Sequence, residues 1–217
     1  MKITSLQNFI DQMLKTVENR RQLSSKYLVN KEVDFDALQQ LTAVYHGIEQ
    51  IPNQNGWKLL TLSEGESSRV NVDYETEELK KDIWFFEKGE NQLIKHLSEL
   101  HSAYWQEVND GIEFLDSIKF RNFITDRDGT INNYCGRYST SVQSAYNAIF
   151  VSRFTTLIKN KPIILTSAPL QNSGIIDISV NPQDLFIYAG SKGREFRAAD
   201  GTIISYPIEK EKQEMLD

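Results

Sequence analysis

The spacing of apolar residues changes near the middle of the chain, and this change limits the folds that the sequence can adopt. Up to residue 112 the apolar residues recur every three or four positions, which is typical of amphipathic helices. Beyond Gly111 they gather in short runs bounded by proline, glycine and polar residues, as in buried strands. The sequence therefore predicts two parts, a helical module over residues 1–112 and an α/β region over residues 113–217.

Three amphipathic helices are expected in the helical module. The first two cover residues 6–28 and 36–48, with Asp36 as the N-cap of the second. The third is the longest and covers residues 79–108, with a kink at Gly89. Residues 63–68 are rich in serine and glutamate and include a glycine, which predicts a flexible loop. Because a helix with one narrow apolar stripe is not stable alone, we expect an antiparallel bundle or a coiled hairpin.

Three short apolar runs are the predicted strands of the second part, at residues 120–125, 162–166 and 185–189. A helix is expected over residues 144–159, between the first two strands. This order of strands and helix is typical of a parallel, doubly wound sheet. Ligands bind such sheets at the carboxyl ends of the strands, so the residues directly after each strand are the candidates for a site.

The net charge of −6 is distributed unevenly along the chain. Residues 1–118 contain 12 basic and 20 acidic residues, whereas residues 119–217 contain 12 basic and 10 acidic residues. We interpret the acidic half as a solvated helical surface, while the small positive excess of the second half favours an anionic small substrate. An acidic chain without a basic stripe argues against nucleic acid as a partner.

Cysteine content and hydropathy indicate the compartment. No apolar run approaches the roughly 18 residues of a membrane-spanning helix, so no membrane partner is expected. The first residues lack the unbroken apolar stretch of a signal peptide. Cys135 is the only cysteine and cannot form an internal disulfide. These features predict a protein of the reducing cytoplasm.

Two acidic residues follow the first predicted strand. Asp126 and Asp128 are two positions apart, and Gly129 permits a sharp turn directly after them. Two close carboxylates repel each other unless a cation binds between them, and hard oxygen ligands suit Mg²⁺. A metal-bound carboxylate can also attack phosphorus and form an aspartyl phosphate. An acidic turn or a calcium-type loop is the alternative interpretation.

Three segments of the second part resemble one enzyme family. Residues 123–130, Phe-Ile-Thr-Asp-Arg-Asp-Gly-Thr, resemble the first motif of the haloacid dehalogenase-like phosphatases. Thr166 stands where this family has a Thr or Ser that closes the second core strand, with Ser167 as the alternative. Residues 190–195, Gly-Ser-Lys-Gly-Arg-Glu, look like the glycine-rich turn of the trehalose-6-phosphate phosphatase branch. A simple glycine hairpin is the alternative interpretation of this turn.

The resemblance covers about residues 114–217 and implies a fold, a substrate and a mechanism. The fold would be a partial Rossmann-like α/β core of the haloacid dehalogenase type, preceded by an all-α helical bundle or coiled hairpin. The substrate would be a sugar phosphate, with trehalose 6-phosphate as the first choice. Asp126 would attack the phosphorus and Asp128 would act as general acid and base, while the Asp126 carboxylate and the Asp128 backbone carbonyl would bind Mg²⁺. Further substrate contacts would come from Thr166, Ser167, Gly129, Thr130, Arg137 of a mobile flap, Lys192 and Glu195.

Two motifs of that family are missing, namely the lysine that steadies the phosphoryl group and the second acidic pair for Mg²⁺. Residues 196–217 contain Asp200-Gly201 and a charged tail at residues 209–212, but neither follows a fourth core strand. We therefore expect the sequence to be the first part of a longer enzyme, and the 217 residues alone to be inactive. The competing hypothesis is a non-catalytic interaction protein with a degenerate core. In both cases the helical half is a candidate surface for self-association or for a protein partner.

Overall fold

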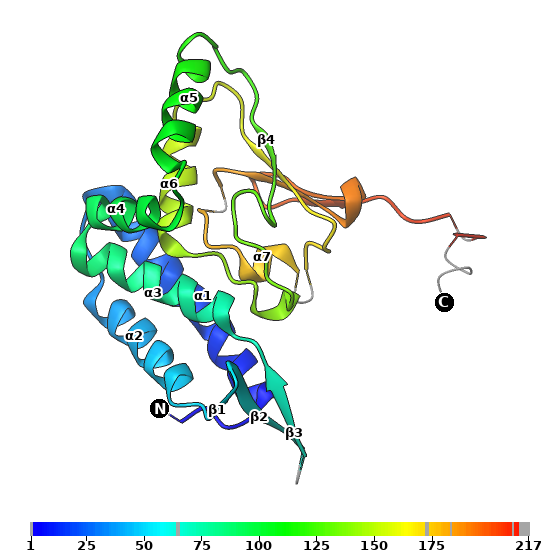
Figure 1. Ribbon diagram of the computed structural model, residues 1–217. Helices are drawn as coiled ribbons and strands as arrows, with labels where there is room; N and C mark the ends of the chain where they lie inside the picture. Colours follow the sequence, from blue (N-terminus) through cyan, green and yellow to red (C-terminus); the bar gives the residue numbers. More distant parts are fainter. Residues whose placement is uncertain (1, 64–65, 172–173, 183, 210, 213–217) are drawn as a thin grey trace.

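Helices from the first half of the chain lie beside a mixed sheet from the second half (Figure 1). The computed structural model describes residues 2–63, 66–171, 174–182, 184–209 and 211–212. None of the helices within these residues combines the length and the apolar character needed to cross a membrane.

The first two predicted helices are confirmed. Helix α1 (Leu6–Asn30) begins after Ser5, whose hydroxyl accepts the Asn8 N–H at 3.1 Å. Helix α2 (Phe35–Glu49) begins after Asp34, whose carboxylate accepts the Ala37 N–H at 3.1 Å. The predicted N-cap Asp36 is therefore wrong, because the side chain two residues earlier reaches the unpaired N–H groups of the first turn.

The predicted third helix is three helices. Helix α3 (Asp73–Lys88) ends at Gly89, whose φ of 87° and ψ of 164° are accessible almost only to glycine. Helix α4 (Glu90–Leu100) ends at His101, which is extended, and α5 (Tyr104–Asp116) follows. The apolar stripe continues through both breaks, which is why spacing alone predicted one kinked helix. No side chain of α5 is buried.

A small antiparallel sheet in the first half was not predicted. It consists of β1 (Asn53–Gln54), β2 (Trp57–Ser63) and β3 (Glu66–Val70), in the order β1-β2-β3. The expected flexible loop over residues 63–68 is wrong where it is described, because residues 66–68 pair with β2; residues 64–65 lie outside the described part. The sheet has few buried apolar side chains, among them Leu60 and Val70, so it produces no apolar run in the sequence.

The second half forms a five-stranded sheet in the order β4-β5-β6-β7-β8. The three predicted strands are present and parallel, as β4 (Ile124–Asp126), β5 (Ile163–Leu165) and β6 (Ile187–Gly190). They are shorter than predicted, since residues 120–123 lie outside β4. Strands β7 (Glu195–Arg197) and β8 (Ile203–Ser205) add an antiparallel hairpin, so the sheet is mixed rather than wholly parallel.

Helix α6 (Ala145–Thr155) connects the two halves. It ends four residues earlier than predicted, and its buried residues Ala145, Tyr146, Ala148 and Ile149 share one hydrophobic core with helices α1 to α4. A second, smaller core lies around Ile164, Phe186 and Tyr188 and includes Ile175 of α7 (Ile175–Ile178), whereas Ile178 of the same helix belongs to the first core. The helical half therefore supports the sheet through α6.

Three acidic residues of α3 face this junction. Glu75, Glu78 and Asp82 are all buried, so the expectation that the acidic half is a solvated surface is wrong for this helix. One Asp82 oxygen lies 2.6 Å from Nε of the buried Arg20 in α1, and the other accepts the Tyr146 N–H in the first turn of α6 at 3.0 Å. Burial raises the pKa of Asp82 to about 6, against the opposing effect of Arg20. Asp82 thus caps α6 and pairs with α1 at the same time.

We expect Asp82→Asn to destabilise the chain by about 3–5 kcal/mol, because it leaves the buried Arg20 guanidinium without a counter-charge. The asparagine can still accept the Tyr146 N–H, so the loss reports the ion pair. Thermal unfolding of the 217-residue chain measures it.

Glu77→Gln in the same helix is the control, since Glu77 forms an exposed pair with Lys80 at 3.7 Å. Such pairs contribute little, so its melting temperature should stay near that of the unmodified chain. Equal losses in the two variants would show that the buried pair has no special importance.

Candidate functional site

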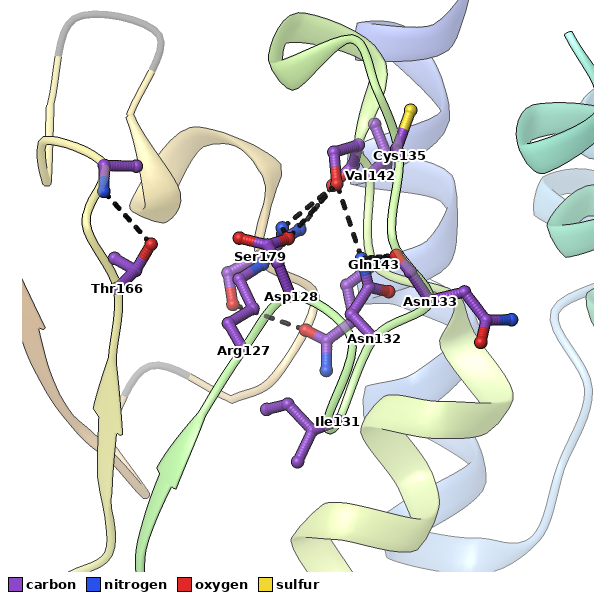
Figure 2. A network of polar contacts seen from close by, with 12 residues as sticks. Arg127, Asp128, Ile131, Asn132, Asn133, Cys135, Val142, Gln143, Thr166 and Ser179 are labelled. Carbon is purple, nitrogen blue, oxygen red and sulfur yellow. Dashed lines mark hydrogen bonds and ion pairs between the residues drawn. The ribbon is translucent and has the colours of Figure 1, made fainter.

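The carboxyl ends of β4 and β5 meet at one edge of the sheet. Asp126, the last residue of β4, pairs in parallel register with Leu165, the last residue of β5. Thr166 follows directly and donates its N–H to the Ala189 carbonyl of β6 at 2.9 Å. Figure 2 shows Thr166 and Asp128 just beyond the ends of these strands. Because neighbouring strands lie about 4.8 Å apart, the first and second predicted motifs come within reach of one ligand.

The side chains of Asp126 and Thr166 differ in what they bind. Asp126 is exposed, and none of the described residues binds its carboxylate. Thr166 is buried, and its hydroxyl accepts the Ala168 N–H at 3.2 Å while it keeps its own proton to donate. Ser167 is exposed. The edge therefore offers a free carboxylate beside a fixed hydroxyl.

Asp128 is held by a residue that the sequence analysis did not single out. The buried guanidinium of Arg127 forms a close ion pair with the Asp128 carboxylate. The same guanidinium binds the Ser141 hydroxyl at 3.1 Å and the Ser141 carbonyl. The sequence does contain a sign of this role, because Arg127 lies between two acids at the end of a strand. Successive side chains of a strand point to opposite faces, so Arg127 is expected to point away from the exposed Asp126.

The loop after Asp128 is closed by its own backbone. Gly129 has a φ of +83°, and its N–H donates to the Asn132 carbonyl at 2.7 Å. Asn132 in turn donates its N–H to the Arg127 carbonyl at 3.0 Å, and the Thr130 N–H makes a longer contact of 3.4 Å with the same oxygen. The N–H groups of Gly129 and Thr130 are thus used within the loop, and their contact with substrate stays a prediction.

The glycine-rich turn forms a hairpin against the edge. Gly190 pairs with Glu195 across β6 and β7, and a Cβ at Gly190 would lie 2.7 Å from a methyl carbon of Leu170. The Glu195 carboxylate accepts the Leu170 N–H at 2.9 Å and the Ser191 hydroxyl at 3.0 Å. The hairpin interpretation is confirmed, and a substrate contact by Glu195 stays a prediction.

Lys192 lies at the tip of this hairpin in the 3₁₀ helix η2 (Ser191–Gly193). Its side chain is exposed, its φ is 56°, and its N–H lies 3.3 Å from the Thr166 carbonyl. The structure thus brings Lys192 to the same edge as Asp126 and Thr166.

Arg137 is placed elsewhere. Its guanidinium forms an ion pair of 2.6 Å with Glu75 of α3 and lies 5.8 Å from the ring centre of Phe9. It lines a cavity of about 530 Å³ between α3 and residues 133–137. Cys135 also lines this cavity. Burial raises the pKa of the Cys135 thiol, so the thiol is not activated. The structure joins Arg137 to the helical half and not to the Asp126 edge.

The oxygen donors for a metal are two carboxylates and the nearby backbone carbonyls. No group of three or more His, Cys, Asp or Glu side chains suited to a metal occurs within the described residues. Mg²⁺ commonly uses one or two protein carboxylates and keeps several waters, so the Asp126 carboxylate and the Asp128 backbone carbonyl fit part of its shell. The Asp128 carboxylate is paired with Arg127, so Asp126 is the one of the two aspartates whose carboxylate is free to bind a metal.

Several curated proteins of nematodes are similar to this chain. Alpha,alpha-trehalose-phosphate synthase (UDP-forming) 2 of Caenorhabditis elegans is 28% identical over 92% of this chain and 18% of its own length. Trehalose-phosphatase of Brugia malayi is 27% identical over 89% of this chain and 45% of its own length. The chain thus spans less than half the length of either relative.

Two family profiles match consecutive parts of the chain. Residues 5–103 match the trehalose-6-phosphate phosphatase N-terminal helical bundle domain. Residues 123–217 match the profile described as trehalose-6-phosphate phosphatase, C-terminal. The first match covers α1 to α4 with the small sheet, and the second covers the five-stranded sheet with α6 and α7. The chain therefore belongs to the trehalose-6-phosphate phosphatase family.

Proposed function

We propose that the chain carries the nucleophile and the general acid and base of a Mg²⁺-dependent phosphatase with a haloacid dehalogenase-like core, and that its substrate is trehalose 6-phosphate. The supporting observation is the sheet edge where Asp126, Asp128 and Thr166 follow two neighbouring parallel strands. Relatives named trehalose-phosphatase support the choice of substrate. The second half of the chain, with its small positive excess, is the part that meets the anionic phosphate.

The proposed reaction has two steps. A carboxylate oxygen of Asp126 attacks the phosphorus and the bond from phosphorus to the sugar oxygen breaks. Asp128, which has to be protonated in the substrate complex, gives its proton to that oxygen. Asp128 then takes a proton from water, whose oxygen attacks the same phosphorus. The bond to Asp126 breaks, inorganic phosphate leaves, and both carboxyl groups return to their starting states.

Other residues hold the phosphoryl group during these steps. The Thr166 hydroxyl donates to a phosphoryl oxygen, since the bond that it accepts from the Ala168 N–H leaves its own proton free. Bound Mg²⁺, with the Asp126 carboxylate and the Asp128 backbone carbonyl among its ligands, would neutralise the charge on the phosphoryl oxygens. Lys192, exposed at the same edge, supplies a positive charge for the substrate.

Replacing Asp126 by asparagine in the full gene product should lower kcat for trehalose 6-phosphate at least about a thousandfold, because the amide cannot form the covalent intermediate. Phosphate release with and without Mg²⁺ measures this, and chelation of the metal should abolish turnover in the unmodified enzyme. Asp110→Asn, at an exposed position of α5, is the matched control and should leave kcat unchanged. Retained turnover in the Asp126 variant would eliminate it as the nucleophile.

The 217-residue chain by itself should release little or no phosphate, because its described residues offer no third acidic side chain for the metal. The same assay, run in parallel on this chain and on the full gene product, measures the difference. Robust Mg²⁺-dependent turnover by the 217 residues would contradict this expectation. Inactivity of both proteins would instead favour a non-catalytic interaction protein. The cytoplasmic location and a partner for the helical half stay predictions.

A further inference from the structure

We infer that helix α3 of the helical half positions the general acid of the sheet edge, through a chain of side chains from Tyr74 to Arg127. This inference rests on the proposed function and deepens it. Arg127 and Tyr74 are positioning residues in this account, since neither is placed against the reacting atoms. No part of the resemblance in sequence assigns either of them a role.

Arg127 fixes Asp128 from one side. The guanidinium forms an ion pair with one oxygen of the Asp128 carboxylate (Figure 2). It also binds both the hydroxyl and the carbonyl of Ser141. The Ser141 hydroxyl also lies 3.5 Å from the same carboxylate oxygen. Arg127 and Ser141 are 2% and 1% exposed, so water does not compete for these contacts. The other Asp128 oxygen has no partner among the described residues and remains for the substrate.

Asn132 connects this cluster to α3. Its side-chain N–H₂ group lies 2.9 Å from the Tyr74 hydroxyl and 3.5 Å from the Ser141 hydroxyl. Tyr74, at the start of α3, donates its hydroxyl proton to the Val142 carbonyl at 2.9 Å. Residues 132 and 142 flank the segment that leaves the loop and reaches α6, so one tyrosine from the helical half binds both ends of it.

The Tyr74 hydroxyl is well suited to this contact. Burial raises the pKa of Tyr74, with Glu78 acting in the same direction, so the hydroxyl stays protonated and keeps its two roles as donor and acceptor. Asn132 is 2% exposed, and its N–H₂ group also lies 3.4 Å from the Asn133 carbonyl. Loss of the Tyr74 hydroxyl would leave the buried Val142 carbonyl and the buried side-chain amide of Asn132 without their shortest hydrogen bonds.

The rate of the first step depends on the position of Asp128 for some leaving groups and not for others. A sugar alkoxide is a poor leaving group and needs a proton from Asp128 as its bond to phosphorus breaks. An aryl phosphate with an acidic phenol leaves without that proton. Moving the acid therefore slows the first step for the sugar phosphate and leaves the aryl phosphate almost unchanged.

The decisive variant is Tyr74→Phe in the full gene product. We expect kcat/KM for trehalose 6-phosphate to fall at least about tenfold, and kcat/KM for para-nitrophenyl phosphate to change less than about threefold. Arg127→Lys keeps the charge but loses the forked contacts, and should give the same selective loss. Tyr45→Phe in α2, whose hydroxyl makes no hydrogen bond to the described residues, is the control and should alter neither rate.

Equal losses for both substrates, or no loss in Tyr74→Phe, would overturn the inference while leaving the proposed function intact. An unmodified enzyme that hydrolyses neither substrate would overturn the proposed function instead. Hydrogen exchange of the 217-residue chain then tests the contact by itself. Tyr74→Phe should speed exchange of the Gly129 and Asn132 amides at least about tenfold, because these close the loop. Unchanged exchange would show that α3 does not hold the loop.

Discussion

The carboxylate of Asp82 binds groups from both halves of the chain, and the arrangement of the two halves depends on it. One oxygen meets Arg20 of α1, and the other accepts an N–H group in the first turn of α6, all within a hydrophobic core. Burying two charges costs several kcal/mol per ion, which offsets much of their mutual attraction. The same burial raises the pKa of Asp82, while Arg20 lowers it. The contribution of the pair therefore lies in selecting one arrangement. If α6 shifted by one turn, it would leave Asp82 without its second partner and Tyr146 without its N–H acceptor.

The same face of α3 extends from this ion pair to the sheet edge. Glu75 and Glu78 lie at helical spacing before Asp82, and both reach residues of the second half. Glu75 binds Arg137 and Thr140, while Glu78 binds Asn133 at 2.7 Å and the Tyr146 hydroxyl at 3.2 Å. This face is a polar strip buried between two parts of one protein. The segment from residue 132 to residue 142, which leaves the acidic loop, is bound by it at several points. The hydrophobic core likewise continues across the two regions that the family profiles match separately.

The spacing of residues in the sequence predicted the helices and strands that follow from a local pattern. It did not predict the contacts between residues that are far apart in the sequence. Helices α1 and α2 were predicted because their buried residues recur at helical spacing, and β4 to β6 because apolar runs end at polar residues. The placement of Asp126 and Thr166 at one edge followed from the order of parallel strands. Burial of Glu75, Glu78 and Asp82 could not be predicted. The sequence of a helix does not show whether an acidic side chain is exposed to water or is paired with an arginine that lies far away in the sequence. The role of Arg127 was hidden for the same reason, since its partner Ser141 is 14 residues away.

The hairpin after β6 has a strained backbone beside the edge that we propose for the substrate. Ser191 and Lys192 have φ values of 49° and 56°, and each non-glycine residue in this left-handed region costs about 1–2 kcal/mol. The strain is held by contacts to the loop after β5: Ser191 donates its N–H to the Ala168 carbonyl at 2.7 Å, and Glu195 binds the Leu170 N–H. Strained backbone of this kind gathers at functional sites, where surrounding contacts fix it. Because Glu195 is occupied by these internal bonds, the phosphate contact that we propose for the hairpin comes from the exposed Lys192. A positive charge is thereby held at the tip of the turn, next to Thr166, by a conformation that a relaxed loop would not adopt.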